Sequence, residues 1–363
     1  MRILGIETSC DETAAAIVEE VDDAAKPWVI RSSVVASQVE IHREWGGVVP
    51  ELASRQHIRD ICGVVERAMG DAGLTARDLG AIAVTQGPGL VGSLLVGVSF
   101  AKALAASWQL PLVPVHHLAG HIESLFLQHG PLPLPAMVLV VSGGHTSLYD
   151  VQSPGEYRAI GRTRDDAAGE AYDKVAKLVG LGYPGGPVID RLAKLGNDRA
   201  VQFPVARMTH PDRNEPLKKG QWDFSFSGLK TAVLRHVRAQ GASWTPSPQE
   251  LADLCASFQR SVVEALLEKT FSAARWYGAR SVGIAGGVSA NSRLRADAAA
   301  AGARAGLPVY VPTLALSTDN AAMIAAAGLR GYHAGVRADE GLNADASLAL
   351  TPVSRKSSVA SSQ

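Results

Sequence analysis

The chain has 363 residues, of which 47% are apolar and 19% charged, so it can bury a large core and is not wholly disordered. At roughly 100–200 residues per domain, this length predicts about two domains. Lysine plus arginine and aspartate plus glutamate both total 35, which gives a net charge of zero. A nucleic-acid partner would therefore need a local basic patch, because the chain has no global positive field.

Cysteine usage and hydropathy indicate the compartment. Cys10, Cys62 and Cys255 are far apart and form no CxxC pair, which excludes a disulfide framework and a zinc ribbon. The N-terminus runs directly into an apolar strand, and no stretch approaches the ~18 uninterrupted apolar residues of a membrane helix. We expect a cytoplasmic protein with no membrane contact.

Two blocks of similar pattern lie far apart in the chain. Residues 3–20 read as strand, polar turn and strand, and residues 137–151 repeat this pattern around the turn at 142–145. Alternating segments follow each block, with strands expected at 81–85, 112–115, 281–285 and 309–311 and helices at 54–72, 93–107, 169–179, 248–277 and 320–331. The repeat predicts an internally duplicated α/β protein. We expect residues 210–222 to form an exposed loop and 351–363 a disordered tail.

The segment from Gly87 to Gly92 matches the G-x-G-x-x-G dinucleotide pattern between a strand and a helix. Such a site needs an acidic residue at the end of the next strand, and that strand ends in His116 and His117. The strand also follows a hairpin, whereas it comes first in a Rossmann unit. We interpret these glycines as a close-packed turn that opens a helix.

His117 and His121 form the sharpest local signal, because a helix would place both on one face as two metal ligands. From the pair alone, metal binding and a structural role are equally good interpretations. Gly120 favours a site, because glycine costs about 1 kcal/mol inside a helix and so usually has a packing or functional reason. A metalloprotease would need Glu directly after the first histidine, where Leu118 stands, so a metallopeptidase is a weak alternative.

Other polar segments could complete such a site. Asp319 precedes an apolar helix and is either a third ligand or an N-cap. Two histidines and a carboxylate would leave coordination positions open and suit iron or zinc. The glycine turns at 142–146 and 286–291 would let backbone N–H groups approach a phosphate. Asp11 and Glu12 could act near that phosphate or form an ordinary acidic turn.

Taken together, these segments resemble the TsaD/Gcp family of tRNA N6-adenosine threonylcarbamoyltransferases, in its bacterial form. The matches occur in family order at residues 5–13, 46–55, 86–90, 116–121, 141–146, 169–174, 226–230, 286–291 and 317–320. The resemblance implies an α/β actin-like, sugar-kinase-like (ASKHA) fold, with two duplicated ribonuclease-H-like domains and an interdomain cleft. The implied domains are 1–134, completed by 320–350, and 135–319, which includes the loop 210–222; the tail 351–363 follows.

The resemblance also implies a reaction and its site. Threonylcarbamoyl would pass from threonylcarbamoyl-AMP to N6 of adenosine 37 in tRNAs that read codons starting with A. By the family pattern, one divalent metal, usually assigned as iron, is bound by His117, His121 and Asp319. The implied adenylate-binding residues are Val140, Val141, Ser142, Gly143, Gly144, Asp173, Gly186, Asp190 and Asn291. Asp11 and Glu12 are the candidates for catalysis, because the first hairpin should face the cleft.

The implied partners are tRNA, an inactive paralogue subunit (TsaB-like), a small ATPase (TsaE-like) and an adenylate synthase (TsaC-like). For tRNA contact the sequence offers two clusters, Arg213 with Lys218 and Lys219, or Arg235 with Arg238, although each could be a solvated charged surface. Two other functions stay open. An actin-like or sugar-kinase-type ATPase would leave the two histidines without a role, and a non-enzymatic scaffold would bind nucleotide and partners only.

Overall fold

The computed structural model describes residues 1–205, 222–241, 244–339 and 341–350. The expected tail 351–363 and the expected loop 210–222, except for Trp222, lie outside the described residues. The same is true of Arg213, Lys218 and Lys219, one of the two clusters proposed for tRNA contact.

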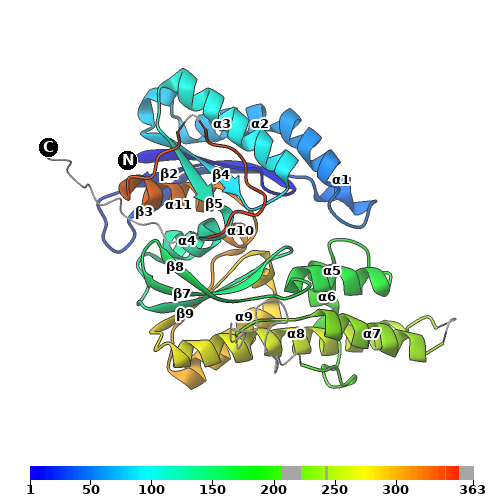
Figure 1. The fold of residues 1–363 in the computed structure, drawn as a ribbon. Helices are drawn as coiled ribbons and strands as arrows, with labels where there is room; N and C mark the ends of the chain where they lie inside the picture. Colours follow the sequence, from blue (N-terminus) through cyan, green and yellow to red (C-terminus); the bar gives the residue numbers. More distant parts are fainter. Residues whose placement is uncertain (206–221, 242–243, 340, 351–363) are drawn as a thin grey trace.

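The described chain forms two mixed five-stranded sheets with equivalent strand orders (Figure 1). The first has the order β3 (Trp28–Ser37), β2 (Glu12–Glu20), β1 (Arg2–Glu7), β4 (Ala81–Gly87) and β5 (Leu112–His116). The second has the order β8 (Glu156–Arg162), β7 (Thr146–Ser153), β6 (Ala136–Val141), β9 (Ser281–Ala285) and β10 (Val309–Tyr310). In each sheet the first three strands of the chain are antiparallel, and the other two run parallel to the first. The predicted internal duplication is therefore confirmed.

The sequence of each strand reflects its place in its sheet. β1 and β6 are the central strands, and β6 is buried along its whole length, which explains its unbroken apolar run. β3 and β8 are edge strands with alternating or mixed exposure.

Two helices, α4 (His117–His129) and α11 (Ala321–His333), lie between the sheets (Figure 1). Their side chains join residues of both sheets in one hydrophobic core, so nearly every position of the two helices is buried. Glycines allow this close packing. A Cβ on Gly5 of β1 would lie 2.3 Å from the carbonyl oxygen of Ala321, and one on Gly120 would lie 2.8 Å from Cδ1 of Ile324.

The outer face of each sheet is covered by further helices. α2 (Pro50–Ala72) and α3 (Val91–Trp108) cover the first sheet. The second carries α5 (Ala168–Leu178), α7 (Ser227–Ala239), α8 (Pro248–Trp276) and α9 (Ser292–Ala305), with α6 (Gly185–Ala193) packed on α5 and α8. The short helices are α1 (Val39–Arg43) and α10 (Leu314–Ser317).

The turn from Gly87 to Gly92 is closely packed, as predicted, and α3 begins within it. A Cβ on Gly89 would lie 2.6 Å from the carbonyl oxygen of Ser9, and one on Gly92 would lie 2.4 Å from Oγ of Ser54. By length and composition, α3 is the one helix of the described residues that could cross a membrane. One face of it packs against β4 and α2, and 33% of it is buried.

Candidate active site

A cavity of about 1030 Å³ lies at the carboxyl ends of the parallel strands of both sheets. Its lining includes the turns that follow β1, β4, β6 and β9, together with parts of α5 and α6. Open α/β sheets bind their ligands at this edge, because the backbone turns there leave N–H groups and side chains unpaired by the sheet. The duplication therefore brings two such edges to one site.

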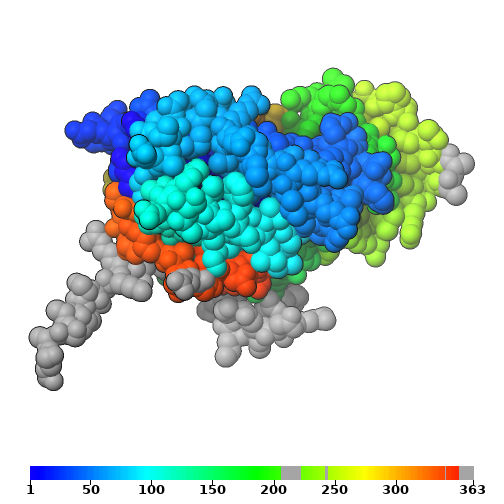
Figure 2. All heavy atoms as spheres, turned by 90° about the horizontal axis from the view of Figure 1, so that it is seen from above, coloured from blue at the N-terminus to red at the C-terminus, as the bar shows by residue number. Residues whose placement is uncertain are grey.

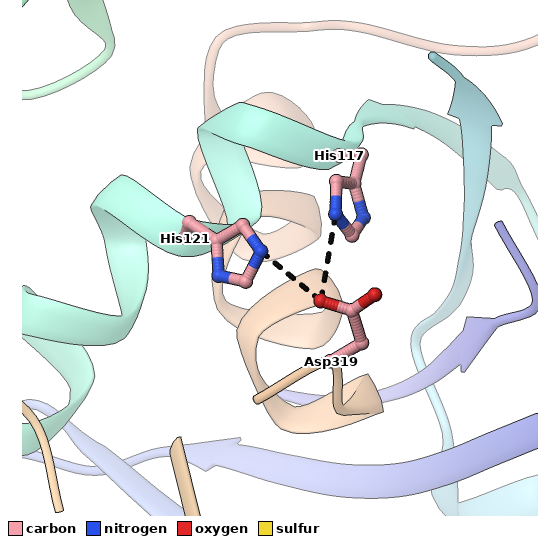
Figure 3. Close-up of side chains that lie close together, drawn as sticks. All are labelled: His117, His121 and Asp319. Atoms are coloured by element: carbon pink, nitrogen blue, oxygen red, sulfur yellow. Dashed lines mark ion pairs between the residues drawn. The ribbon is translucent and has the colours of Figure 1, made fainter. Parts of the chain in front are cut away.

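His117 and Asp319 line this cavity, and the buried His121 lies beside them (Figure 3). Each offers one ligand atom, and these atoms lie within 4.8 Å of one another. Nε2 of His121 is 3.1 Å from Oδ1 of Asp319, and Nε2 of His117 is 3.6 Å from the same oxygen. The two histidines are one turn apart at the start of α4, so both rings point toward the carboxylate.

The residues fit a divalent metal. Among the described residues, Nε2 of His121 is buried, makes no hydrogen bond of regular geometry and faces Oδ1 of Asp319 at 3.1 Å, an arrangement that a bound cation would satisfy. Asp319 is also not needed as a cap, because the side chain of Asn320 accepts from the N–H of Met323 at the start of α11. Two imidazoles and one carboxylate serve zinc and non-haem iron alike.

Glu7, at the end of β1, contacts the ring nitrogen of His117 that faces away from Asp319 and so orients the ring. It is fully buried, and its Oε2 lies 3.1 Å from Nδ1 of His117 and accepts the hydroxyl of Thr85 at 2.7 Å. A carboxylate that accepts from one ring nitrogen leaves the other free to ligate, as in carboxylate–histidine–metal sites. Sequence reasoning missed Glu7, because it is a single acid at the end of an apolar strand.

The charges in this cluster depend on one another. Burial would raise the pKa of Asp319, but His117 and His121 hold it well below its usual range. Burial would lower the pKa of His117, yet Asp319 and Glu7 raise it to about 9. Burial would also raise the pKa of Glu7, and His117 lowers it overall. A metal must therefore displace a tightly bound proton from His117.

Two further histidines flank the ligands. Burial lowers the pKa of His116 to about 4, and burial with the neighbouring His117 and His121 lowers that of His145 to about 4. His145 lines the cavity with its ring centroid 6.4 Å from that of His117. Sequence reasoning had singled out its glycine turn only for the backbone, although the histidine in that turn was itself a signal.

Most residues predicted to bind the adenylate line the cavity: Ser142, Gly143, Gly144, Asp173, Gly186, Asp190 and Asn291. Nothing lies within 4 Å of where a Cβ would stand on Gly143, Gly144 or Gly186, so a ligand can approach the backbone there. Val140 and Val141 are fully buried strand residues and do not line the cavity.

Gln259 of α8 was not singled out from the sequence. It is buried, and its amide donates to Oδ1 of Asp190 at 3.1 Å and accepts from Nδ2 of Asn291 at 2.8 Å. Asn291 also caps α9 by accepting from the N–H of Leu294. Gln259 thus connects two predicted adenylate-binding residues from behind the cavity wall.

Asp11 lies in the turn after β1 and Glu12 begins β2, and both line the cavity, as predicted for a hairpin that faces the cleft. Burial raises the pKa of Glu12 to about 9, and the adjacent Asp11 adds to that shift. Glu12 accepts the hydroxyl of Ser37 at 2.7 Å. Folding therefore favours the protonated form of Glu12.

Comparisons with known proteins agree with this architecture. A solved structure titled full-length HypF in the phosphate- and nucleotide-bound form matches 92% of this chain and 46% of its own, at a TM-score of 0.56 and 14% identity. At that identity the likeness concerns the fold alone, and the predicted actin-like, sugar-kinase-like (ASKHA) fold is confirmed.

Sequence relatives identify the family. The family model of TsaD, tRNA N6-adenosine threonylcarbamoyltransferase, matches residues 29–326. Proteins of that name in Anaeromyxobacter dehalogenans and Bacillus subtilis are 54% and 50% identical to this chain. The alignments cover 95% and 97% of this chain and 98% and 96% of the relatives. The chain belongs to the tRNA N6-adenosine threonylcarbamoyltransferase family.

Proposed function

We propose that this chain transfers the threonylcarbamoyl group from threonylcarbamoyl-AMP to N6 of adenosine 37 in tRNAs that read codons starting with A. The observation that carries the proposal is the His117, His121 and Asp319 cluster, which lies at a nucleotide-sized cavity in a chain of this family. A kinase or ATPase on the same fold would have no use for two buried histidines that face a carboxylate.

The adenylate would lie across the glycine turns. Gly143, Gly144 and Gly186 leave space for a ligand beside their backbone, while the carboxylate of Asp173 accepts the N–H of Gly185 at 2.7 Å at the start of α6. Asp190 and Asn291 would hold the nucleoside, fixed by Gln259. The backbone N–H groups of the glycine turns would balance the charge on AMP as it leaves.

The metal, when bound, would act as a Lewis acid on the carbamoyl oxygen or the phosphate. Iron is our choice over zinc, on family resemblance. In the transfer, N6 forms a bond to the carbamoyl carbon, the bond from that carbon to the phosphate oxygen breaks, and AMP leaves with the electron pair. N6 then loses a proton. We assign its uptake to the Asp11 and Glu12 pair, because both side chains line the cavity.

For tRNA we propose an approach over the rim of the cavity, named here the basic rim: Lys177, Arg191 and Lys194. All three are exposed and line the cavity, and among the described residues neither Lys177 nor Arg191 has an ion-pair partner. Nζ of Lys177 lies 3.7 Å from where a Cβ on Gly46 would stand, beside the exposed Trp45. Cations with an aromatic ring suit a single-stranded loop of RNA.

For the protein partners we propose an inactive paralogue subunit, a small ATPase and an adenylate synthase. Ile58 of α2 and Val91 and Leu95 of α3 are large apolar side chains left exposed on neighbouring helices, and Figure 2 looks onto this face. They support docking of the paralogue there. We further propose a cytoplasmic location, and domains at 1–134 with 320–350 and at 135–319.

The function is tested by reconstitution. Purified chain, the three helper proteins, threonine, bicarbonate, ATP and unmodified tRNA are incubated, and the tRNA is digested to nucleosides for mass analysis. We expect N6-threonylcarbamoyladenosine with this chain and none with Asp319→Ala. ATP hydrolysis or phosphorylation by this chain in the absence of the helper proteins, without the modified nucleoside in the full mixture, would favour the kinase alternative. Adenylate binding without tRNA modification would favour a scaffold.

A further inference from the structure

Residues 342–350, termed the strap, cross the ends of β4 and β5 after the last residue that the family model matches. Side chains of β4 and α3, which belong to the first sheet and the helices that cover it, bind the start of the strap. Nζ of Lys102 donates to the carbonyl of Leu342 at 3.0 Å, and Nε2 of Gln86 donates to that of Asn343 at 3.2 Å. In Figure 2 the red-orange strap lies along the cyan surface of α3.

The middle of the strap reaches the active site. The N–H of Gly89 donates to the carbonyl of Ala346 at 3.3 Å, and Ala346 itself lines the cavity. The strap lies so close to β4 that a Cβ on Gly87 would be 1.9 Å from the carbonyl oxygen of Asp345. This close fit requires glycine in β4, so the strap binds at a defined position on the first sheet.

His116 joins the end of the strap to α4. Its Nδ1 accepts from the N–H of Leu118 at 3.1 Å and so caps the helix. A neutral imidazole carries one N–H, so the proton is on Nε2, which donates to the carbonyl of Leu348 at 3.0 Å. Both ring nitrogens are therefore committed, one to the metal-site helix and one to the strap.

His116 therefore connects the end of the strap to the first turn of α4. A second cavity, of about 460 Å³, separates Leu348, Ala349 and Leu350 from Arg330 and Arg337. Leu350 packs against the core between the sheets, while the cavity leaves open space beside the end of the strap. His117 follows His116 directly and His121 lies one turn further, so a shift in the first turn of α4 would move both ligand nitrogens.

We propose that His116 is a positioning residue that transmits the docking of the strap to the first turn of α4 and thereby sets the affinity of the metal site. The inference rests on the proposed metal site. Displacement of the strap frees the His116 ring, loosens the helix cap and spreads the histidines away from Asp319. Groups behind the ligands of a metal site commonly change its affinity 10–100-fold.

Three variants of the full chain separate the contacts. His116→Ala removes both bonds of the ring. His116→Asn keeps a capping group for α4 but is too short to reach the strap. Asp345→Ala leaves the ring intact and removes the carboxylate that holds the strap turn through the N–H and hydroxyl of Ser347. His333→Ala, an exposed histidine at the far end of α11, is the matched control.

Two measurements are made on each purified protein, with thermal melting as the check of folding. Zn²⁺ alone is titrated in competition with a chromogenic chelator, and amide hydrogen exchange is followed in the peptide that contains the first turn of α4. We expect the affinity for Zn²⁺ to fall about tenfold in all three variants. Exchange in that turn should be faster in each, and His333→Ala should match the wild type.

The inference is overturned if Asp345→Ala and His116→Asn bind Zn²⁺ within twofold of the wild type, because the strap then has no part in the site. Unchanged exchange in Asp345→Ala overturns it as well, and this readout needs no metal. If the wild type binds no Zn²⁺ but exchange is faster in the variants, the proposed metal site and the effect on its affinity are removed. Only the link from strap to helix then remains.

Discussion

Nδ1 of His117 lies 3.1 Å from the carboxylate of Glu7, and both side chains are buried. The contact joins the end of β1 to the first residue of α4. It fixes which nitrogen of His117 faces Asp319, so a residue outside the predicted ligand set governs the metal site.

Glu7→Gln should weaken metal binding about tenfold, because a neutral amide is a poorer acceptor for the N–H of His117 and no longer raises its basicity. Zn²⁺ titration against a chelator measures this. Glu20→Gln is the matched control, since the carboxylate of Glu20 lies at the surface and pairs with the exposed His333, away from the site. Wild-type affinity in Glu7→Gln would show that the carboxylate does not orient the ligand.

Gln259→Leu should weaken the binding of AMP several-fold, because Asp190 and Asn291 lose the amide whose hydrogen bonds fix their side-chain positions. The expected kinetic sign is a raised KM for the adenylate with kcat little changed. Calorimetric titration with AMP and steady-state kinetics check both. Gln249→Leu, at an exposed position of the same helix, should leave both unchanged. A several-fold loss of kcat with no change in the KM for the adenylate would contradict the positioning role.

The basic rim makes a prediction about tRNA. The double variant Lys177→Ala and Arg191→Ala should weaken tRNA binding and reduce the slope of log affinity against log salt by up to about two. Fluorescence anisotropy at several salt concentrations measures both, with AMP affinity as the check that the cavity is intact. Arg235→Ala with Arg238→Ala, on α7, changes the same charge and tests the sequence-based cluster. An altered slope in that variant alone would move the tRNA contact to α7.

The Glu12 carboxyl predicts a pH effect on stability. Its pKa rises from 4.5 to about 9 on folding, so the folded state binds the proton more tightly than the unfolded state. That stabilisation is complete below pH 4.5 and is lost as the pH rises toward 9. Between these limits, the melting temperature of the wild type should fall relative to that of Glu12→Gln. Parallel curves for the two proteins would contradict the raised pKa.

The sequence predicted the central elements well, because buried strands and amphipathic helices have strong periodic signals. The strands expected at 81–85 and 281–285 form β4 and β9, and the helix expected at 54–72 begins earlier, at Pro50. The outer strands β3 and β8 were not predicted. They are edge strands in which alternation is only partial and no continuous apolar run occurs, so the period-two signal is weak.

The candidate site was predictable only where its residues are neighbours in the chain. The spacing of His117 and His121 suffices to place both on one helix face. Glu7 contacts His117 across 110 positions, and Gln259 contacts Asp190 across 69, so their roles depend on tertiary packing. Gly120 was read as a sign of a site, and the structure gives it a packing role, because α11 leaves no space for a side chain there.

The most direct test of the proposed function is mass analysis of tRNA nucleosides from cells depleted of this protein. The account predicts that N6-threonylcarbamoyladenosine disappears on depletion, returns when the wild-type chain is expressed, and does not return with Asp319→Ala. An unchanged level of the modified nucleoside after depletion, or full recovery with Asp319→Ala, would contradict it.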